Sequence, residues 1–189
     1  AKEKGVSAYK LMDEEAERVE AGSKRILFLP YLMGERSPWW NPNARGVFFG
    51  IALGHRREHL IRAVLEGVTF NLRVILDAFE EQGAAVKDVR VIGGGARSNL
   101  WRRIMADIYG KTILIPAYLE EATSLGAAIA AGVGVGVYRS FEAAEHLVNF
   151  VETINPNLDL HARYESFYKY FRKLYTSMVP LYDELSSLE

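Results

Sequence analysis

The sequence feature that most constrains the fold is a run of three glycines between an apolar segment and an amphipathic one, within residues 89–109. Before the glycines, Val89, Val91 and Ile92 are β-branched, which is typical of a buried strand. After them, apolar residues recur at the spacing of a helix, and these are Leu100, Ile104 and Ile108. The stretch therefore predicts a strand, a glycine loop and a helix in direct succession.

A glycine loop that opens a helix can bind an anion. The first turn of a helix has N–H groups without partners and a partial positive charge. Glycine also lets that backbone approach a phosphate without a Cβ in the way. Ser98 or Asn99 could cap the helix, and the side-chain amide of Asn99 could also face a nucleobase. A tight turn that binds nothing explains the glycines equally well, since glycine turns are common between strands and helices.

The spacing of the glycines fits neither of two common nucleotide-binding motifs. No Gly-Lys-Ser/Thr follows, as a Walker loop would require. Position 98 is Ser, so the spacing of a dinucleotide-binding fingerprint also fails. The loop alone therefore does not identify a ligand.

Composition limits the classes of function. The chain has 189 residues, which suits one domain with a sizeable core, and its net charge of -1 gives no reason to expect nucleic acid as a partner. It contains no Cys, so disulfides and thiolate chemistry are excluded, and a cytoplasmic location is compatible with this. No apolar run reaches the roughly 20 residues of a membrane span, so no membrane partner is expected. Because the chain begins at Ala1 without Met, we expect it to be a piece of a larger protein.

The remaining pattern alternates strands and helices. We expect a surface helix within residues 1–23 that ends near Gly22, and a long amphipathic helix over 57–82. The other expected elements are strands at 26–32, 47–53, 112–115 and 149–154, a small-residue helix at 123–136 and a short helix at 141–147. This order predicts an α/β layered domain with helices against a mixed sheet.

Two helices near the end of the chain carry more specific expectations. Residues 123–136 are mostly Ala and Gly, so this helix should pack hard against a neighbouring element, with Thr123 or Ser124 at its N-terminus. That N-terminus would point toward the same cleft as the glycine loop. The last thirty residues carry an aromatic stripe, which favours packing over ligand binding, on a helix kinked or broken at Pro180.

Three further groups are candidates for chemistry, and a structural role is the favoured interpretation of each. The loop 34–46 is long, and its tryptophans can pin it to the core while Glu35 satisfies local backbone groups. Glu66 lies close to the apolar face of the long helix, where a carboxylate is usually hydrogen-bonded rather than catalytic. His55 and His59 have a spacing that can hold a metal, but no third ligand lies nearby, so no metal site is predicted.

Several stretches, in this order along the chain, resemble the FGGY family of carbohydrate kinases. They are LPYLMGERSPWWNPNARGVFFGI at 29–51, HLIRAVLEG at 59–67, IGGGARSNLWRRIMADIYG at 92–110, EEATSLGAAIAAGVGVG at 120–136 and the terminal YESFYKYFRKLY at 164–175. The resemblance implies the C-terminal half of an actin-like ATPase fold, related to ribonuclease H, in which two similar domains close around ATP and a sugar. Residues 1–25 are then an N-terminal helical segment, and residues 26–189 are the nucleotide-binding domain with its terminal helix at 159–187.

The resemblance also assigns roles to the glycine loop. Gly95 resembles the glycine whose amide meets the nucleotide phosphates, and Asn99 resembles the residue near the adenine. Gly93, Gly94 and Ala96 form the rest of that cradle. The implied cofactors are ATP and Mg²⁺, and the implied reaction is transfer of the γ-phosphoryl group to a sugar hydroxyl, which depends on positioning and electrostatic stabilisation.

By the same resemblance, the chain lacks parts of the kinase. The catalytic Asp, the first phosphate hairpin, most sugar contacts and the opening strands of the C-terminal domain belong upstream of Ala1, so the catalytic base lies outside this chain. The chain alone should be inactive, and the N-terminal domain of the same protein is its expected partner. A homodimer is also expected for members that resemble this family.

The choice of sugar rests on short motifs. GERSP at 34–38, VFFGI at 47–51 and EATSLGAA at 121–128 look most like xylulokinase, which converts ATP and D-xylulose to ADP and D-xylulose 5-phosphate. Gluconokinases share part of the first motif, so gluconate or another sugar or polyol is an alternative substrate. A non-catalytic interaction module of the same actin-like fold is the alternative from a different class.

Overall fold

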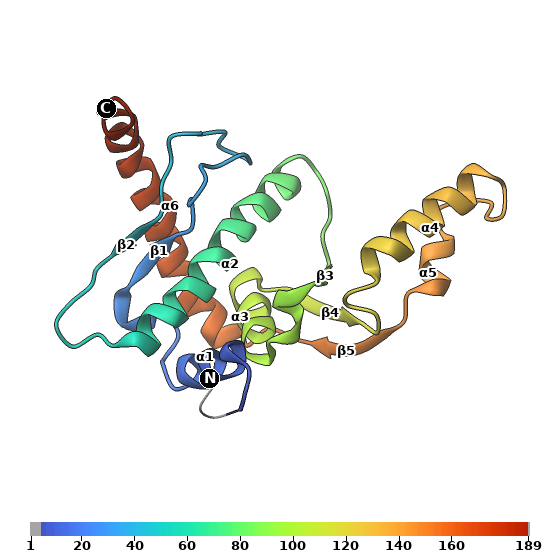
Figure 1. Cartoon of the computed structure of the whole chain (residues 1–189), viewed down its shortest axis with the longest axis horizontal. Helices are drawn as coiled ribbons and strands as arrows, with labels where there is room; N and C mark the ends of the chain where they lie inside the picture. Colours follow the sequence, from blue (N-terminus) through green and yellow to red (C-terminus); the bar gives the residue numbers. More distant parts are fainter. Residues whose placement is uncertain (1–4, 189) are drawn as a thin grey trace.

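A computed structural model describes residues 5–188 as a body of helices and two small sheets from which an arm projects (Figure 1). The elements are α1 (Ala8–Glu17), the 3₁₀ turn η2 (Ser23–Arg25), β1 (Leu27–Leu29), β2 (Val47–Phe49), α2 (Arg57–Glu81), β3 (Asp88–Arg90), the 3₁₀ turn η3 (Gly94–Arg97), α3 (Asn99–Tyr109), β4 (Thr112–Pro116), α4 (Ala122–Gly134), α5 (Ala143–Leu147), β5 (Phe150–Ile154) and α6 (Leu158–Ser186). Across residues 5–188, no helix is both long enough and apolar enough to cross a membrane. The expected alternation of strands and helices is confirmed.

The strands form two sheets rather than the one mixed sheet expected from the sequence. β1 pairs antiparallel with β2, with Phe28 opposite Phe48, and both rings pack at a centroid distance of 4.5 Å. β3 pairs parallel with β4, and β4 pairs antiparallel with β5, which gives the order β3-β4-β5. Within residues 5–188 no strand ladder joins the two sheets. The prediction of a single mixed sheet was therefore wrong. Hydrophobic periodicity identifies individual strands, but it does not show which strand edges lie side by side in the fold.

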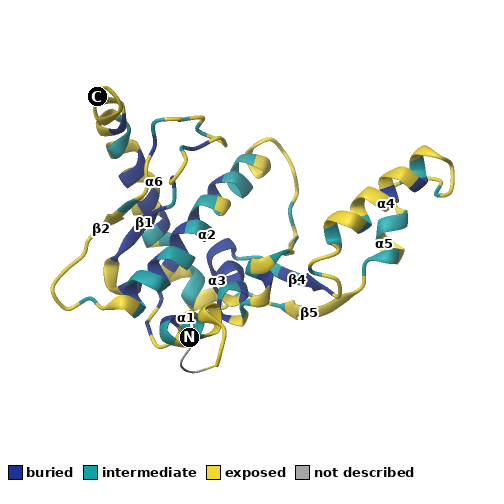
Figure 2. Ribbon diagram, in the orientation of Figure 1, coloured by how far each residue is buried: buried dark blue, intermediate teal, exposed yellow. Residues whose placement is uncertain are grey.

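The core lies between α2, α3 and α6 (Figure 2). Phe70 on α2 contacts three aromatic rings of α6 at centroid distances of 5.5–6.0 Å, and these are Tyr164, Tyr168 and Phe171. Burial of one such ring stabilises the fold by roughly 1.5–3 kcal/mol. The aromatic stripe of the last helix is therefore packing, as the sequence predicts.

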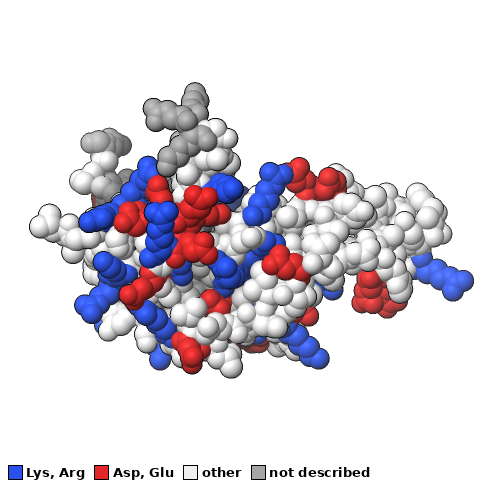
Figure 3. All heavy atoms as spheres, turned by 90° about the horizontal axis from the view of Figure 1, so that it is seen from below, with Lys and Arg blue, Asp and Glu red and all other residues white. Residues whose placement is uncertain are grey.

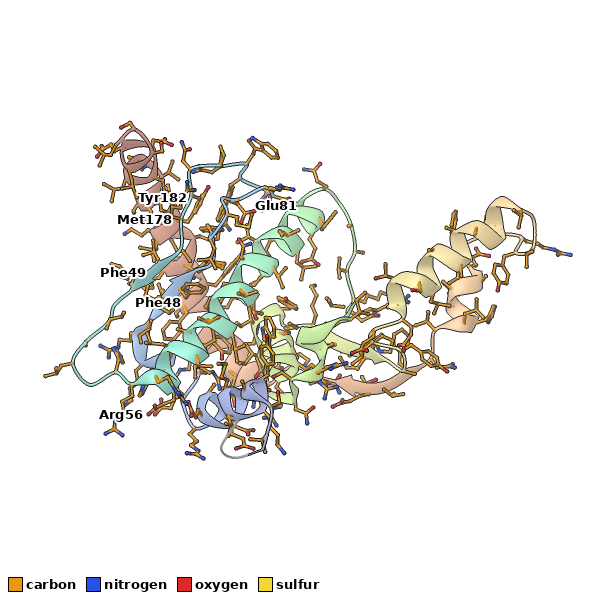
Figure 4. All side chains as sticks on the ribbon, viewed as in Figure 1. Phe48, Phe49, Arg56, Glu81, Met178 and Tyr182 are labelled. Carbon is orange, nitrogen blue, oxygen red and sulfur yellow. The ribbon has the colours of Figure 1, made fainter. Side chains whose placement is uncertain are left out.

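The terminal helix α6 continues through Pro180, so of the kink or break expected there, the break is wrong. Pro180 has no N–H and cannot bond to the carbonyl of Thr176 one turn earlier. Thr176 is exposed, so water can satisfy that carbonyl. On either side, Tyr175 and Tyr182 are buried and hold the helix to the core. Figure 4 labels Tyr182 on this last part of α6.

The chain between α1 and β1 makes a left-handed turn, which we call the 22–25 turn. Gly22, Ser23, Lys24 and Arg25 have φ values of 87°, 48°, 50° and 75°. This region of conformational space is costly for residues with a Cβ, and it persists only where surrounding contacts impose it. α1 itself ends at Glu17, before the predicted end near Gly22.

The contacts that impose this turn come from the carboxylate of Glu66. The N–H of Gly22 donates to Oε1 at 2.9 Å, and the hydroxyl of Ser23 donates to Oε2 at 2.7 Å. Arg62 Nε and the Tyr164 hydroxyl also donate to Oε1, at 2.8 and 2.7 Å. All of these side chains are buried, so the hydrogen-bonded structural role predicted for Glu66 is confirmed. Burial, followed by the negative charge of Glu66, raises the pKa of the Tyr164 phenol well above its usual value.

The arm consists of α4 and α5 and extends away from the body (Figure 1). The tight packing expected for α4 is wrong, because Ile129 and Gly132 are the buried residues of this helix. A Cβ added at Gly126 or Gly134 would meet no atom within 4 Å. Gly132 alone among the three glycines of α4 within residues 5–188 is closely packed, since a Cβ there would come within 2.5 Å of the Tyr138 ring.

The arm is also poor in charge where it is exposed. Residues 122–138 contain no Asp, Glu, Lys or Arg, yet most of them face solvent (Figure 2). Acidic and basic side chains are interspersed over the body, and the arm shows few of either sign (Figure 3). α4 is N-capped at Glu121 rather than at Thr123 or Ser124. An uncharged helix exposed on most of its surface is typical of a surface that another structural element covers.

Candidate functional site

The glycine loop lies where two parallel strands end. β3 and β4 run in the same direction, with Val89 opposite Ile113. The loop that follows β3 and the loop that follows β4 therefore leave the sheet at the same edge. In open α/β sheets this carboxyl edge is where ligands bind.

Two contacts join these loops. The N–H of Gly93 donates to the carbonyl of Leu119 at 3.2 Å. Arg97 and Glu120 form an ion pair, and both side chains are mostly exposed. The glycine loop and the start of the arm are therefore neighbours, although α4 does not pack against the loop.

Two N–H groups of the glycine loop have no internal partner. Gly93 takes a φ of 79°, which favours glycine, and the next four residues form η3. Inside that turn, Ala96 N–H donates to Gly93 and Ser98 N–H donates to Gly95. Among residues 5–188, no acceptor pairs with the N–H of Gly94 or Gly95. These are the donors that an anion at the start of η3 would meet.

Gly94 and Gly95 differ in the atoms that a side chain would meet at each position. A Cβ on Gly95 would lie 2.8 Å from Cζ3 of Trp101, so packing inside the chain already requires glycine there. A Cβ on Gly94 would meet nothing within 4 Å, and Gly94 does not have positive φ. No described neighbour therefore explains the glycine at 94, whereas a closely approaching phosphate would.

The first residues of α3 distinguish the two candidate caps. Ser98 is the N-cap, and its hydroxyl accepts the N–H of Trp101 at 3.0 Å. Asn99 is the first helical residue and is exposed. Its Oδ1 accepts from Arg102, which also pairs with Glu152 of β5 at 2.5 Å. Because a guanidinium can only donate, the NH₂ of Asn99 is left as an outward donor.

Ala96 has a different environment from its neighbours. It is fully buried and contributes its methyl group to the interior beneath the loop. Its side chain therefore anchors the loop, and its backbone N–H is already used by the bond to Gly93. Gly93, Gly94, Gly95 and Asn99 remain accessible at least in part.

The described residues form no metal centre. Within residues 5–188, no group of three or more His, Asp or Glu side chains could hold an ion. His55 Nδ1 accepts the N–H of Ala52 at 2.8 Å, and His59 Nδ1 accepts the N–H of Arg56 at 3.0 Å. One ring nitrogen of each histidine is thus used in the turn that precedes α2.

The long loop 34–46 is mainly structural. Glu35 accepts the N–H of Arg36 at 2.8 Å and that of Ser37 at 2.7 Å, and Trp39 stacks on Tyr175 at a centroid distance of 4.0 Å. These contacts confirm the structural interpretation of Glu35. Trp40 differs, because 73% of it is exposed at an open hollow of about 690 Å³ beside α6. None of residues 93–99 lines this hollow.

Sequence reasoning missed two supports of the site. Arg102 orients Asn99, and the pair has the i, i+3 spacing of helical neighbours, so this contact was open to prediction. Trp101 contacts Thr69 through a hydrogen bond that spans 32 positions. No local pattern in the sequence signals that second contact.

Comparison with known proteins places the chain in a family. The family model described as "FGGY family of carbohydrate kinases, C-terminal domain" matches residues 1–135. The chain belongs to the FGGY family of carbohydrate kinases. The resemblance in the motifs around the glycine loop is confirmed by this match.

Relatives within the FGGY family include kinases for different substrates. The chain is 38% identical over 187 residues to gluconokinase of Bacillus licheniformis, which covers 98% of this chain and 34% of that protein. It is 33% identical to xylulose kinase of Bacillus subtilis, covering 90% of this chain and 34% of the relative. The chain therefore spans about a third of the length of these curated FGGY relatives.

A solved FGGY structure supports the fold. The ligand-bound xylulose kinase of Lactobacillus acidophilus matches 93% of this chain and 36% of its own chain, with a TM-score of 0.85 and 26% identity. The fold is thus that of FGGY sugar kinases, which have the actin-like ATPase architecture predicted from the resemblance.

Proposed function

We propose that this chain is the nucleotide-binding part of an ATP-dependent kinase that phosphorylates a hydroxyl of a sugar or sugar acid. The observation that carries the proposal is the glycine loop of an FGGY chain, with free N–H groups on Gly94 and Gly95 at the carboxyl edge of β3 and β4. Free amides at a helix N-terminus bind phosphate oxygens without a charged side chain. The division into residues 1–25 and 26–189 is part of this proposal.

The residues of the loop have separate tasks in the proposed site. Gly94 and Gly95 donate their N–H groups to the nucleotide phosphates, and the space above Gly94 lets the phosphate come close. Gly93 supplies the backbone conformation that turns the chain there, and Ala96 anchors it from below. Asn99 donates its NH₂ to an acceptor nitrogen of the base.

The chemical step needs groups that this chain does not supply. When bound, Mg²⁺ would neutralise charge on the transferring phosphoryl group. Residues 5–188 contain no ligand cluster for it, so we place its protein contacts on other parts of the kinase. We likewise place the base that takes the proton of the sugar hydroxyl outside the chain. The chain alone is then inactive, as the sequence predicts.

The partner of this chain is, in the proposal, the remainder of the same kinase. β3 has one unpaired edge, and beside it lies a hollow of about 600 Å³ lined by Leu76 and residues 85–90. The uncharged α4 is a second uncovered surface, and it begins directly after the loop that contacts Gly93. Both surfaces fit a chain that spans a third of its relatives' length. The cytoplasmic location and a homodimer stay predictions.

Two substrates are in competition. The motifs GERSP and VFFGI favour D-xylulose, with D-xylulose 5-phosphate as the product. The 38% identity to a gluconokinase supports gluconate at least as strongly. The assay is therefore run with both substrates, and formation of ADP is measured with the whole kinase and with this chain alone. Activity of the whole kinase on neither substrate would favour another sugar or the non-catalytic interaction module.

The nucleotide site is tested separately from the sugar. Gly94→Ala in the whole kinase should raise the Kd for Mg-ADP by about tenfold, because the added methyl group occupies the space that a phosphate needs. Gly54→Ala is the matched control, since its Cβ would also meet nothing within 4 Å and it lies outside the loop. Calorimetric titration gives both values. Equal affinities of the two variants would contradict the assignment of the loop.

A further inference from the structure

Trp101 joins the glycine loop to the middle of α2. Its ring lies against Gly95, where a Cβ would come within 2.8 Å of the ring. Its backbone N–H donates to Ser98 Oγ at 3.0 Å, and its indole N–H donates to Thr69 Oγ1 at 2.9 Å. Trp101 thus contacts the loop and α2 through its side chain, and the N-cap of α3 through its backbone.

Thr69 is built to receive this bond. It is fully buried, and its hydroxyl donates to the carbonyl of Leu65 at 2.7 Å. A hydroxyl has a single proton, so Thr69 Oγ1 can meet Trp101 only as an acceptor. The direction of both bonds is therefore fixed, and so is the orientation of the indole ring.

Ala96 anchors the loop through its buried methyl group, and two further contacts hold the ends of the loop. The Gly93 bond to Leu119 fixes its first residue, and the exposed ion pair between Arg97 and Glu120 is open to solvent and salt. The Trp101 ring lies against Gly95, which carries one of the two free amides. It is the contact best placed to hold those amides in one position.

We propose that Trp101, held by Thr69, is a positioning residue for the nucleotide. The ring fixes the backbone of Gly94 and Gly95 so that both N–H groups meet the phosphates without reorganisation on binding. Neither Trp101 nor Thr69 touches the nucleotide. This inference rests on the proposed function and names the residues that prepare its site.

The test removes the acceptor and keeps the shape. Thr69→Val in the whole kinase leaves the partly buried indole N–H without its partner, so the Kd for Mg-ADP should rise about three- to tenfold. The KM for the sugar should stay unchanged, because the change is transmitted through the phosphate loop. Thr69→Ser keeps the hydroxyl and should restore the affinity of the native protein.

The matched control is Thr176→Val on α6. Thr176 also donates its hydroxyl to the carbonyl four residues earlier, that of Arg172, at 3.1 Å. It lies on the exposed side of α6, so its substitution should leave the Kd for Mg-ADP unchanged. Thermal melting of all variants shows whether affinity falls with the loss of fold.

Each outcome has a definite meaning. A weaker Mg-ADP complex in Thr69→Val, with unchanged sugar KM and rescue by Thr69→Ser, supports the positioning role. Native affinity in Thr69→Val, or a loss for nucleotide and sugar alike that the Ser variant does not restore, overturns it. If the native kinase itself does not bind Mg-ADP, the proposed function is overturned, and this result is distinct from a failure of the positioning role alone.

Discussion

The 22–25 turn and the glycine loop at 93–97 differ in how their backbone N–H groups find hydrogen-bond acceptors. Both turns use positive φ, at four residues in the first and at Gly93 in the second. In the first, the N–H of Gly22 meets a carboxylate that the protein itself supplies, that of Glu66. In the second, two N–H groups meet no acceptor among residues 5–188. The first turn has its donors satisfied by the protein, and the second leaves two donors open.

The pairing of the N–H groups distinguishes a turn that stabilises the fold from a turn that can bind a ligand, and a glycine motif in the sequence does not. The carboxylate of Glu66 is buried and bonded on every side, so it cannot exchange for a ligand. In the glycine loop, Gly94 and Gly95 are accessible at least in part, and their amides have no partner among residues 5–188. A turn whose donors are satisfied internally stabilises the fold, whereas a turn with open donors is the place where an external phosphate can bind.

The largest effect is expected at the completed turn. Glu66→Gln removes the charge that pairs with buried Arg62 and that holds the 22–25 turn, so the free energy of unfolding should fall by about 3 kcal/mol. Urea denaturation followed by circular dichroism measures this change. A loss below about 1 kcal/mol would mean that the turn does not depend on the carboxylate.

A pH titration tests the same network through its phenol. Burial and the charge of Glu66 raise the pKa of Tyr164, so the folded protein keeps this phenol neutral at a pH where the unfolded chain ionises it. Stability from Tyr164 is complete below pH 10 and is lost above it, by up to about 1.4 kcal/mol per pH unit.

Alkaline unfolding curves of native protein and Tyr164→Phe supply the measurement. The slope of stability against pH should be smaller in the variant above pH 10. The absorbance change of phenolate should coincide with unfolding in the native protein. Identical slopes would show that Tyr164 ionises as freely in the folded state as in the unfolded chain.

A methyl group added to the glycine loop should change the free energy of unfolding by an amount that depends on its position. Gly95→Ala places a Cβ against the Trp101 ring, and it should lower the free energy of unfolding by about 1 kcal/mol. Gly94→Ala, in open space, should change it by less than about 0.5 kcal/mol. Thermal melting in the absence of nucleotide compares the two. The reverse order would mean that Gly94, and not Gly95, is packed inside the protein.

A small gain in stability is expected at the 22–25 turn. Lys24 is exposed and has a φ of 50°, which costs little for glycine. Lys24→Gly should therefore raise the free energy of unfolding by about 0.5 kcal/mol, and Lys24→Ala, which keeps the Cβ, serves as its control. Equal denaturation midpoints for the two variants would show that the turn carries no such cost.

The sequence alone determined the local elements of this protein. Glycines after Val91 and Ile92 predicted the strand, loop and helix, and Ser98 was one of two predicted caps. The periodic apolar face predicted α2 almost to its ends. These features depend on residues only a few positions apart, and backbone propensity and helical spacing act over that range.

Only the tertiary structure decided how those elements combine. Glu66 reaches Tyr164 across 98 positions and Trp101 reaches Thr69 across 32, so neither contact leaves a periodic signal. The two sheets, the uncovered α4 and the continuous α6 were decided in the same way, by packing that outweighs local preference. A glycine has the same letter whether it accommodates an indole ring, as at 95, or faces open space, as at 94, and the surrounding atoms distinguish the two.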